Sequence, residues 1–514
     1  MKIKHYILLL ILVLPVLILR DFTPNNELKY LSIADEALRD GHFFTFYNHG
    51  EVYADKPPLY FWLLMGSRLL FGGWYMGILA LFSILPALGC IWIMNRWIQP
   101  MVDGKGQWNA SLMLFTSAMF IGSGIVLRMD MLMCLFILLA LHTFYQMYSG
   151  EGKYRDKILL PVYIFLAIFA KGPVGFIAPV FSIIVFLLVK KEWRQLGRYL
   201  GWRTWVILLG LCVIWFGGVY AEGGNEYLNN LLFHQTLDRA SDSFHHKEPF
   251  WYYGIAYWYS LAPWSILYIT VIVIGLRKKL LNTDLEKFFL TVIATLFILM
   301  SLFSAKLDIY LLPIFPFFTY LTALLLPKMK FKWIAFTVYI PVIIFIAAPF
   351  VLLGMGNIPG IPSSAFIHAG TWALALFAVA GCYFLYRKQP FPAINFTALG
   401  VLTTLFIGGF ALPRINPTIG WAALAERAQE IQQTEKLDNY YFFRFRSGEN
   451  MDAYLEQPLT KLTEEEELPS TLEKGDGLIF IREKDVKRNS GIASWLPTVR
   501  NEKIGNFYIV IPGK

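Results

Sequence analysis

Residues 173–189 read PVGFIAPVFSIIVFLLV, and two lysines, Lys190 and Lys191, follow them directly. A membrane-spanning helix needs roughly 17 to 25 apolar residues, so this uncharged run is long enough for one. Such runs dominate the chain: of its 514 residues 56% are hydrophobic and only 16% are charged, whereas soluble proteins carry about 25% charged residues. The sequence therefore predicts an α-helical polytopic membrane protein and excludes a soluble globular one.

We expect about thirteen transmembrane helices. The first run follows Lys2 and Lys4, as the core of a signal peptide would, but Leu19-Arg20-Asp21 lacks the small residues of a cleavage site. We therefore expect an uncleaved helix at this position. The predicted spans cover residues 5–20, 74–95, 108–126, 130–148, 157–170, 173–190, 204–221, 255–276, 286–304, 309–326, 333–354, 364–386 and 393–412.

The Lys and Arg residues of the short loops predict the orientation, because cytoplasmic loops are enriched in these cations. With the N-terminus in the cytoplasm, the cytoplasmic loops hold nineteen of them, and the opposite short loops hold three, Arg128, Lys171 and Lys306. An odd number of spans then places the C-terminus outside. We therefore predict a multi-pass protein of the cytoplasmic (inner) membrane with an extracytoplasmic C-terminus.

Two long outer loops, 21–73 and 222–254, follow from this topology. Residues 57–72 of the first loop are apolar, but the stretch is short for a membrane span and contains Arg68. Counting them as a span would reverse every later loop and violate the charge bias. We expect two helices lying along the outer membrane surface instead, one at 57–72 and one at 27–39.

The chain becomes polar near its C-terminus. We predict a transmembrane domain at 1–412 and a small extracytoplasmic α/β domain at 413–514, with a helix at 422–433 and strands at 440–444, 477–482 and 506–511. The net charge is +9, but residues 421–514 hold 13 Lys and Arg against 16 Asp and Glu, which leaves +12 for the rest. The basic excess therefore belongs to the membrane part and does not indicate a nucleic-acid partner.

The three exceptions in the short outer loops are the informative cations. Arg128, which is followed by Asp130, and Lys171 and Lys306 all lie at outer ends of spans, on the same side as both long loops. Those loops add further charged and imidazole side chains. Cations gathered at one membrane face, with carboxylates among them, suit a phosphorylated lipid headgroup. The residues that the loops contribute are Glu27, Asp55, Lys56, Glu226, His234, Arg239, His245, His246, Lys247 and Glu248.

Several short motifs, in a fixed order, resemble bacterial C-type membrane glycosyltransferases of the aminoarabinose (lipid A) transferase and protein mannosyltransferase type. The resemblance covers residues 1–330 by motif and the rest by layout. The motifs are Asn26-Glu27-Leu28-Lys29-Tyr30, Tyr53-Ala54-Asp55-Lys56-Pro57-Pro58, Leu127-Arg128-Met129-Asp130, Ala170-Lys171-Gly172-Pro173-Val174-Gly175, His234 with Arg239, Glu248-Pro249-Phe250-Trp251, Pro263-Trp264-Ser265, and Ser304-Ala305-Lys306 with Tyr310-Leu311-Leu312-Pro313.

The resemblance implies an activity. Such enzymes take a sugar from a polyprenyl phosphate and transfer it, with inversion, to an acceptor at the outer face, which can be lipid A, a protein or another surface glycan. The departing phosphate needs fixed cations. Lys56, Lys171 and Arg239 match the family's phosphate-contacting positions, and Arg128 joins them.

The catalytic base is the point at which this sequence departs from the family. Family members carry an Asp-Glu pair at the start of the first outer loop, and this chain has Asn26-Glu27. Asparagine cannot accept a proton. Either Glu27 acts as the base towards a hydroxyl acceptor, which we favour, or the acceptor is a phosphate that is already ionised. We expect Asp130 to orient a neighbouring cation.

Asp55 and His234 match positions that could share a divalent metal ion, and a hydrogen-bonded pair explains them equally well.

The alternative class of function is a transporter or flippase for a lipid-linked substrate. Transporters are typically built from two related halves, with ionisable residues near the middle of the membrane. The sequence has no internal repeat, and its charges gather at one face, which favours the enzyme.

Overall fold

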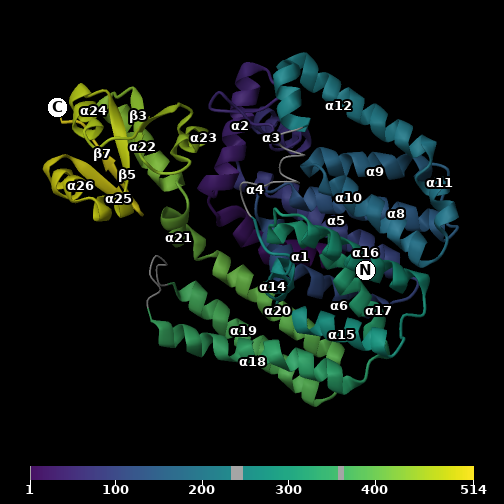
Figure 1. Cartoon of the computed structure of the whole chain (residues 1–514). Coiled ribbons are helices and arrows are strands. Elements are labelled where there is room, and N and C mark those ends of the chain that lie inside the picture. Colours follow the sequence, from purple (N-terminus) through teal and green to yellow (C-terminus); the bar gives the residue numbers. More distant parts are fainter. Residues whose placement is uncertain (1, 233–246, 357–363, 514) are drawn as a thin grey trace.

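The computed structural model of the chain describes residues 2–232, 247–356 and 364–513. A large helical bundle carries a small domain of helices and strands at one end, and the C-terminus lies in that domain (Figure 1). We call this end of the bundle the domain end. The bundle helices are α1 (Ile3–Leu19), α5 (Leu81–Ile98), α6 (Gly104–Phe115), α7 (Ala118–Ile125), α8 (Asp130–Tyr148), α9 (Asp156–Lys171), α10 (Val174–Val189), α12 (Trp202–Asn229), α14 (Tyr252–Ser260), α15 (Ser265–Arg277), α16 (Asp284–Leu302), α17 (Phe315–Leu325), α18 (Phe331–Met355), α19 (Ala365–Tyr386) and α20 (Pro390–Gly409).

The prediction of a polytopic helical membrane protein is confirmed. In the described ranges eight helices are long and apolar enough to cross a membrane, or ten if each of two bent pairs counts as one span. The number thirteen stays a prediction, because several predicted spans are short or broken. Helices α9 and α10 have 16 residues each, a length of about 24 Å against a hydrocarbon core of roughly 30 Å. The predicted span 108–126 is divided into α6 and α7.

The predicted span 255–276 is a bent pair. Helices α14 and α15 meet at an angle of 116°, and Pro263 lies between them, where a residue without an N–H cannot continue the helical hydrogen bonds. The short helix α14 therefore leaves the direction of the bundle. Its exposed side chains are apolar, with Ile255 and Trp258 among them.

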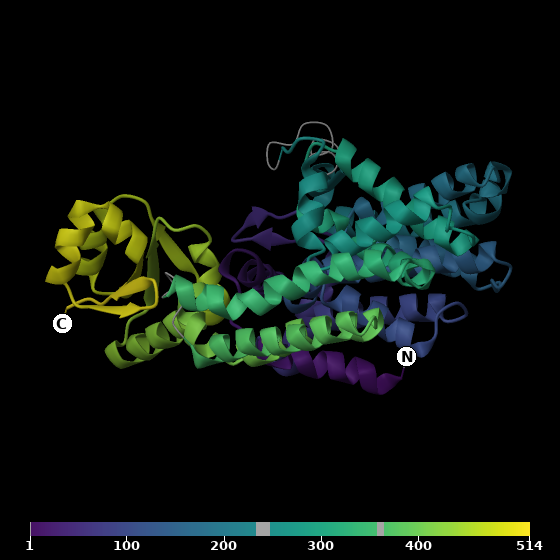
Figure 2. The ribbon, with the colours of Figure 1, turned by 90° about the horizontal axis from the view of Figure 1, so that it is seen from below.

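Helices α18, α19 and α20 form a layer of long helices together with α1 (Figure 2). Close packing between α19 and α20 depends on glycine. A Cβ on Gly400 would lie 2.9 Å from the Phe377 side chain, and one on Gly381 would lie 3.0 Å from the Thr397 hydroxyl. Small residues at such contacts are how membrane helices approach closely.

Residues 21–73, the predicted first outer loop, contain helices at the two predicted positions. A π-helical turn η1 (Pro24–Leu28) leads into α2 (Lys29–Asp40), and together they are bent by 80° from α1. A short hairpin of β1 (Tyr47–Asn48) and β2 (Glu51–Val52) follows, then α3 (Pro58–Phe71) and α4 (Met76–Leu79). Pro58 opens α3, where its missing N–H has no helical partner to lose.

The small domain is the predicted α/β unit. Its five-stranded sheet has the order β4-β3-β5-β7-β6. Strand β3 is parallel to β4 and β5, and β7 is antiparallel to β5 and β6. Three strands were predicted, and β4 and β6 are additional. The elements are α21 (Leu412–Ile419), α22 (Ala422–Glu435), β3 (Asn439–Phe443), η6 (Gly448–Met451), α23 (Asp452–Leu455), β4 (Leu459–Leu462), α24 (Glu467–Lys474), β5 (Gly477–Arg482), α25 (Glu483–Arg488), α26 (Ser490–Trp495), η7 (Leu496–Thr498), β6 (Asn501–Ile504) and β7 (Phe507–Val510).

The small domain and the first outer loop share one hydrophobic core. Buried residues of α2 and α3, such as Leu31 and Phe61, belong to the same cluster as Trp421 and Phe445 of the C-terminal domain. The predicted division between residues 412 and 413 falls just after the first residue of α21, and it stays a prediction. The shared core means that the C-terminal domain and the first outer loop hold each other in place.

Candidate active site at the domain end

Asp130 is the centre of one group of charges. It lies in the first turn of α8 and is 1% exposed. The Lys171 ammonium, at the end of α9, forms a short contact with its Oδ1, and the Arg128 Nε donates to its Oδ2 at 3.0 Å. The Lys171 Nζ also lies 5.1 Å from the centre of the Tyr310 ring. One buried carboxylate is thus shared by two cations, which leaves an excess positive charge.

The glycines that follow Lys171 place its side chain. Gly172 ends α9 with a φ of 100°, a backbone region that residues with a Cβ rarely adopt. A Cβ on Gly175 would lie 2.2 Å from the backbone of Ala167. The sharp turn from α9 into α10 therefore requires both glycines, and it holds Lys171 at the end of its helix.

Asp55 and Lys56 form a second pair immediately before α3. The Lys56 ammonium donates to the Asp55 carboxylate at 3.1 Å, and both side chains are about one-fifth exposed. Lys29, in the first turn of α2, lies close by, with its Nζ 4.4 Å from the centre of the Tyr53 ring. Burial lowers the pKa of Lys29, and the charge of Asp55 opposes part of that shift.

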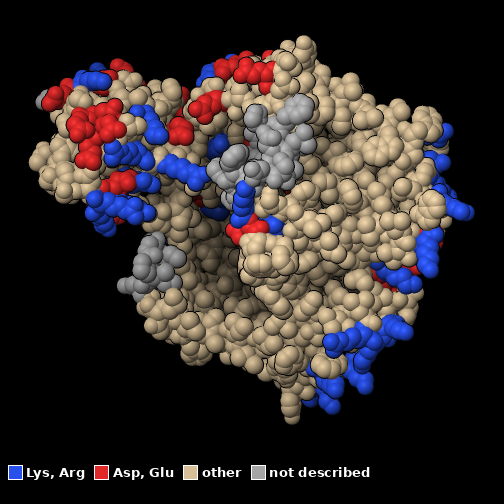
Figure 3. All heavy atoms as spheres, in the orientation of Figure 1, with Lys and Arg blue, Asp and Glu red and all other residues tan. Residues whose placement is uncertain are grey.

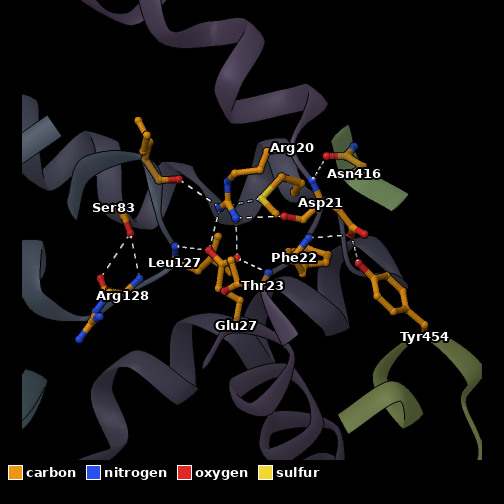
Figure 4. Close-up of polar contacts among 12 residues, drawn as sticks. Arg20, Asp21, Phe22, Thr23, Glu27, Ser83, Leu127, Arg128, Asn416 and Tyr454 are labelled. Carbon is orange, nitrogen blue, oxygen red and sulfur yellow. Dashed lines mark hydrogen bonds and ion pairs between the residues drawn. The ribbon is translucent and has the colours of Figure 1, made fainter. Parts of the chain in front are cut away.

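Glu27 is surrounded by donors on all sides (Figure 4). It is fully buried, and Arg20 at the end of α1 donates to its two oxygens at 2.5 and 2.7 Å. The backbone amides of Thr23 and Leu127 donate at 2.6 and 2.7 Å. These four hydrogen bonds occupy the roughly four lone pairs with which the Glu27 carboxylate can accept hydrogen bonds. Glu27 therefore joins α1, η1 and the segment that leads to Arg128, and this geometry does not suit the base that the sequence favoured.

Asn26 and Arg20 complete this part of the site. Asn26 is an exposed residue of η1, next to Glu27. Arg20 was not predicted as a site residue, although it is a cation at the outer end of a predicted span, the same signal that Arg128 and Lys171 gave. Besides Glu27, its guanidinium donates to the carbonyl of Ile125 at 3.2 Å.

Lys306 is separate from these charges. It is 3% exposed, and its ammonium donates to the backbone carbonyls of Glu248 and Phe303 at 2.8 and 2.5 Å. It therefore joins the segment after residue 246 to the end of α16. The sequence grouped it with the phosphate-type cations, and the structure gives it a structural role.

His234 and Arg239 lie outside the described residues, so the predicted metal pair of Asp55 and His234 and the phosphate role of Arg239 stay predictions. In the described ranges no three His, Cys, Asp or Glu side chains gather as metal ligands would.

The C-terminal domain is fastened to the first outer loop beside the site. Asp21 accepts hydrogen bonds from the Tyr454 hydroxyl and the Ala422 amide. Asp452 accepts from the Ser32 hydroxyl at 2.8 Å and contacts the His49 Nε2 at 2.9 Å. In the space-filling view, Lys and Arg side chains lie in the gap between this domain and the bundle, next to a hollow (Figure 3).

No protein-family model matches the chain. It is 25% identical over 312 residues to an undecaprenyl phosphate-alpha-4-amino-4-deoxy-L-arabinose arabinosyl transferase of Shewanella sediminis, an alignment that covers 57% of this chain and 54% of the relative. The enzyme of the same name, numbered 2, from Sodalis glossinidius is 26% identical over 58% of this chain and 54% of its own. The chain thus spans about half the length of these relatives.

Solved structures extend the likeness to the whole fold. ArnT from Cupriavidus metallidurans bound to undecaprenyl phosphate superimposes with a TM-score of 0.79 at 17% identity, over 99% of this chain and 97% of that one. The arabinosyltransferase EmbB from Mycobacterium smegmatis gives a TM-score of 0.50 at 15% identity, over 83% of this chain and 43% of EmbB. The predicted C-type glycosyltransferase fold and the resemblance to aminoarabinose transferases are confirmed.

Proposed function

We propose that the protein is a glycosyltransferase that moves a sugar from a polyprenyl phosphate to an acceptor, with inversion, at the outer face of a bacterial cytoplasmic membrane. One observation carries the proposal. The cations Lys56, Arg128 and Lys171 lie on three separate segments that meet at one end of a multi-pass bundle, and two of them share a single buried carboxylate. The fold supports it, since ArnT has this fold and binds undecaprenyl phosphate.

On the donor side, these cations stabilise the leaving group. The bond between the anomeric carbon and the phosphate oxygen breaks, and the electron pair stays on the phosphate. Fixed positive charges at the departing oxygen lower the barrier because they need no rearrangement during the reaction. Arg128 offers a planar fork of donors, and the two lysines act as point charges. Arg239 joins them by its motif position.

On the acceptor side, the three carboxylates of the predicted site that the structure describes, Glu27, Asp130 and Asp55, argue against a hydroxyl group. Glu27 is saturated by four donors, Asp130 is held by two cations, and Asp55 pairs with Lys56. We therefore replace the expectation that Glu27 takes a proton. The acceptor is an already ionised phosphate oxygen, as on lipid A, which attacks the anomeric carbon from the opposite face without proton transfer. Glu27 acts as a positioning residue.

The proposed location of the site rests on the charge bias of the loops, which puts the domain end of the bundle outside the cytoplasm. A reporter active only in the cytoplasm, fused after Lys514, should stay silent in this orientation. An active fusion would reverse it and would place the site in the cytoplasm.

The test of the function is transfer by the purified full chain in liposomes. Undecaprenyl phosphate carrying a radiolabelled aminoarabinose is the donor, and lipid A is the acceptor. We expect label on lipid A. The matched control is Arg96→Ala, which removes a cation near the Trp92 ring at the predicted cytoplasmic side and should leave transfer unchanged. Label that changes leaflets without joining an acceptor would reject the enzyme in favour of a flippase.

A further inference from the structure

The loop between β3 and η6, residues 444–447, presents one cation of the C-terminal domain outwards. Arg444 turns back, and its guanidinium pairs with Glu464 at 3.0 Å. Phe445 is 2% exposed and packs against the rings of Trp421 and Phe507. Arg446, the next residue, is exposed. Within the part of the chain that the structure describes, no carboxylate pairs with it.

The shape of this loop is fixed by its own domain. Arg444 and Ser447 have φ angles of 52° and 63°. Residues with a Cβ persist in this conformation only where the surroundings hold them, as at ligand clamps. A Cβ on Gly448 would lie 2.3 Å from the Phe442 ring, so only glycine fits there. The path of the backbone at Arg446 is therefore set before any ligand binds.

The docking of the domain brings this loop to the site. Asn450, one turn further along, donates to the carbonyl of Pro24 at 3.4 Å, and Pro24 begins η1, the turn that carries Asn26 and Glu27. Asp452 adds its bond to Ser32 of α2. The C-terminal domain and the first outer loop are thus held together at Pro24 and Ser32, which lie on either side of Lys29 in the sequence.

The charges around Lys29 show where the 444–447 loop lies. The side chains whose charges act on the Lys29 ammonium are Asp55 and Lys56 from the first outer loop and Glu449 and Arg446 from the C-terminal domain. Three cations and two carboxylates from the two regions thus lie close enough to interact electrostatically, and one of the carboxylates, Asp55, is paired with Lys56. Figure 3 shows Lys and Arg side chains in this gap, beside the hollow.

We propose that Arg446 and Lys29 form a clamp for an anionic group of the acceptor, so that the C-terminal domain supplies half of the acceptor site. The inference rests on the proposed function. A guanidinium grips a phosphate or carboxylate through two parallel donors, and Lys29, at the start of α2, adds a point charge. The donor phosphate uses Lys56, Arg128 and Lys171, and Arg446 of the C-terminal domain is not one of these cations. Loss of Arg446 should therefore weaken binding of the acceptor and leave binding of the donor unchanged.

The experiment measures transfer by the full chain in liposomes, with lipid A and the undecaprenyl-phosphate sugar varied in turn. We expect Arg446→Gln to raise the KM for lipid A roughly 10- to 100-fold, the range for a lost hydrogen bond to a charged group, with the KM for the donor unchanged. Arg446→Lys keeps the charge and loses the two-donor grip, so it should restore only part of the affinity. The matched control is Arg488→Gln on α25, an exposed arginine of the same domain, which should change neither constant.

A second measurement does not depend on turnover. In Arg446→Cys, the new thiol should react with a polar maleimide, and lipid A should protect it, whereas undecaprenyl phosphate and inorganic phosphate should not. Protection by inorganic phosphate alone would mean a general anion site and would overturn the assignment to the acceptor lipid. An unchanged KM for lipid A in Arg446→Gln would reject the clamp alone, whereas a wild-type protein without transfer would reject the proposed function itself.

Discussion

Two buried carboxylates at the domain end, Glu27 and Asp130, differ in what neutralises them. Glu27 has one cation, Arg20, and two backbone amides, so its single charge is balanced within the framework. Asp130 has two cations, Arg128 and Lys171, and no amide bond is recorded for it in the described chain. By formal charge, one centre is therefore neutral and the other is positive by one. A balanced carboxylate holds a structure together, and an excess cation beside a buried carboxylate calls for an anionic ligand.

The largest effect that this difference predicts is on stability at Glu27. Glu27→Gln places an amide NH₂ among four donors and leaves Arg20 buried without its counter-charge. Breaking a buried ion pair by removing one partner costs about 3–5 kcal/mol. We expect a clear fall in Tm, measured by thermal unfolding in detergent, and a loss of transfer that accompanies it.

The control for this prediction replaces both partners with apolar side chains. Arg20→Leu with Glu27→Leu should regain part of the stability, because no unpaired charge remains. A Glu27→Gln protein with normal Tm and no transfer would instead restore Glu27 as the catalytic base.

At the other centre we expect an effect on activity. Lys171→Ala removes the excess cation, while Arg128 still neutralises Asp130, so the fold should persist. Loss of one charge-stabilising donor should lower transfer by about a hundredfold. The comparison is Lys190→Ala, which removes a cation at the far end of α10, where it pairs with Asp284 at 2.7 Å. Equal rates for both variants would contradict a phosphate role for Lys171.

Much of this arrangement could be predicted from the sequence. The positive-inside bias singled out Arg128 and Lys171 because cations at outer helix ends are unusual. The same rule also selected Lys306, whose partners are backbone carbonyls. The rule reports the position of a charge and not its partners. The bonds of Glu27 could not be predicted, because they join Arg20, Thr23 and Leu127, and only the fold brings Leu127 to the first two. The loop that carries Arg446 was missed for the same reason.

A smaller effect concerns Asn26, which lies on the exposed side of the turn whose buried side is Glu27. If the acceptor is an ionised phosphate, Asn26→Asp should change transfer by less than about tenfold, because no proton has to be removed. A positioned base contributes about 10²–10⁴-fold. A rise of that size that increases with pH, measured as transfer rate between pH 6 and 8.5, would show that the acceptor is a hydroxyl group.

The smallest expected effect lies where the first outer loop meets the C-terminal domain. Burial lowers the pKa of His49, but its hydrogen bond with Asp452 and the nearby carboxylates raise it more, so the net shift is upward. A raised pKa in the folded state stabilises the protein below the unfolded value of about 6.5, and this contribution is lost as the pH rises through the folded value. Because the pair is partly exposed, we expect about 1 kcal/mol or less.

The measurement is the difference in Tm between the wild type and His49→Gln. This difference should be larger at pH 6 than at pH 8.5. Burial also raises the pKa of Asp35 to about 6, so the wild type alone would mix two titrations, and the difference removes that of Asp35. A difference that does not depend on pH would mean that His49 docks the two parts as a neutral ring. The ion pair with Asp452 would then make no contribution to the contact that holds Arg446 beside Lys29.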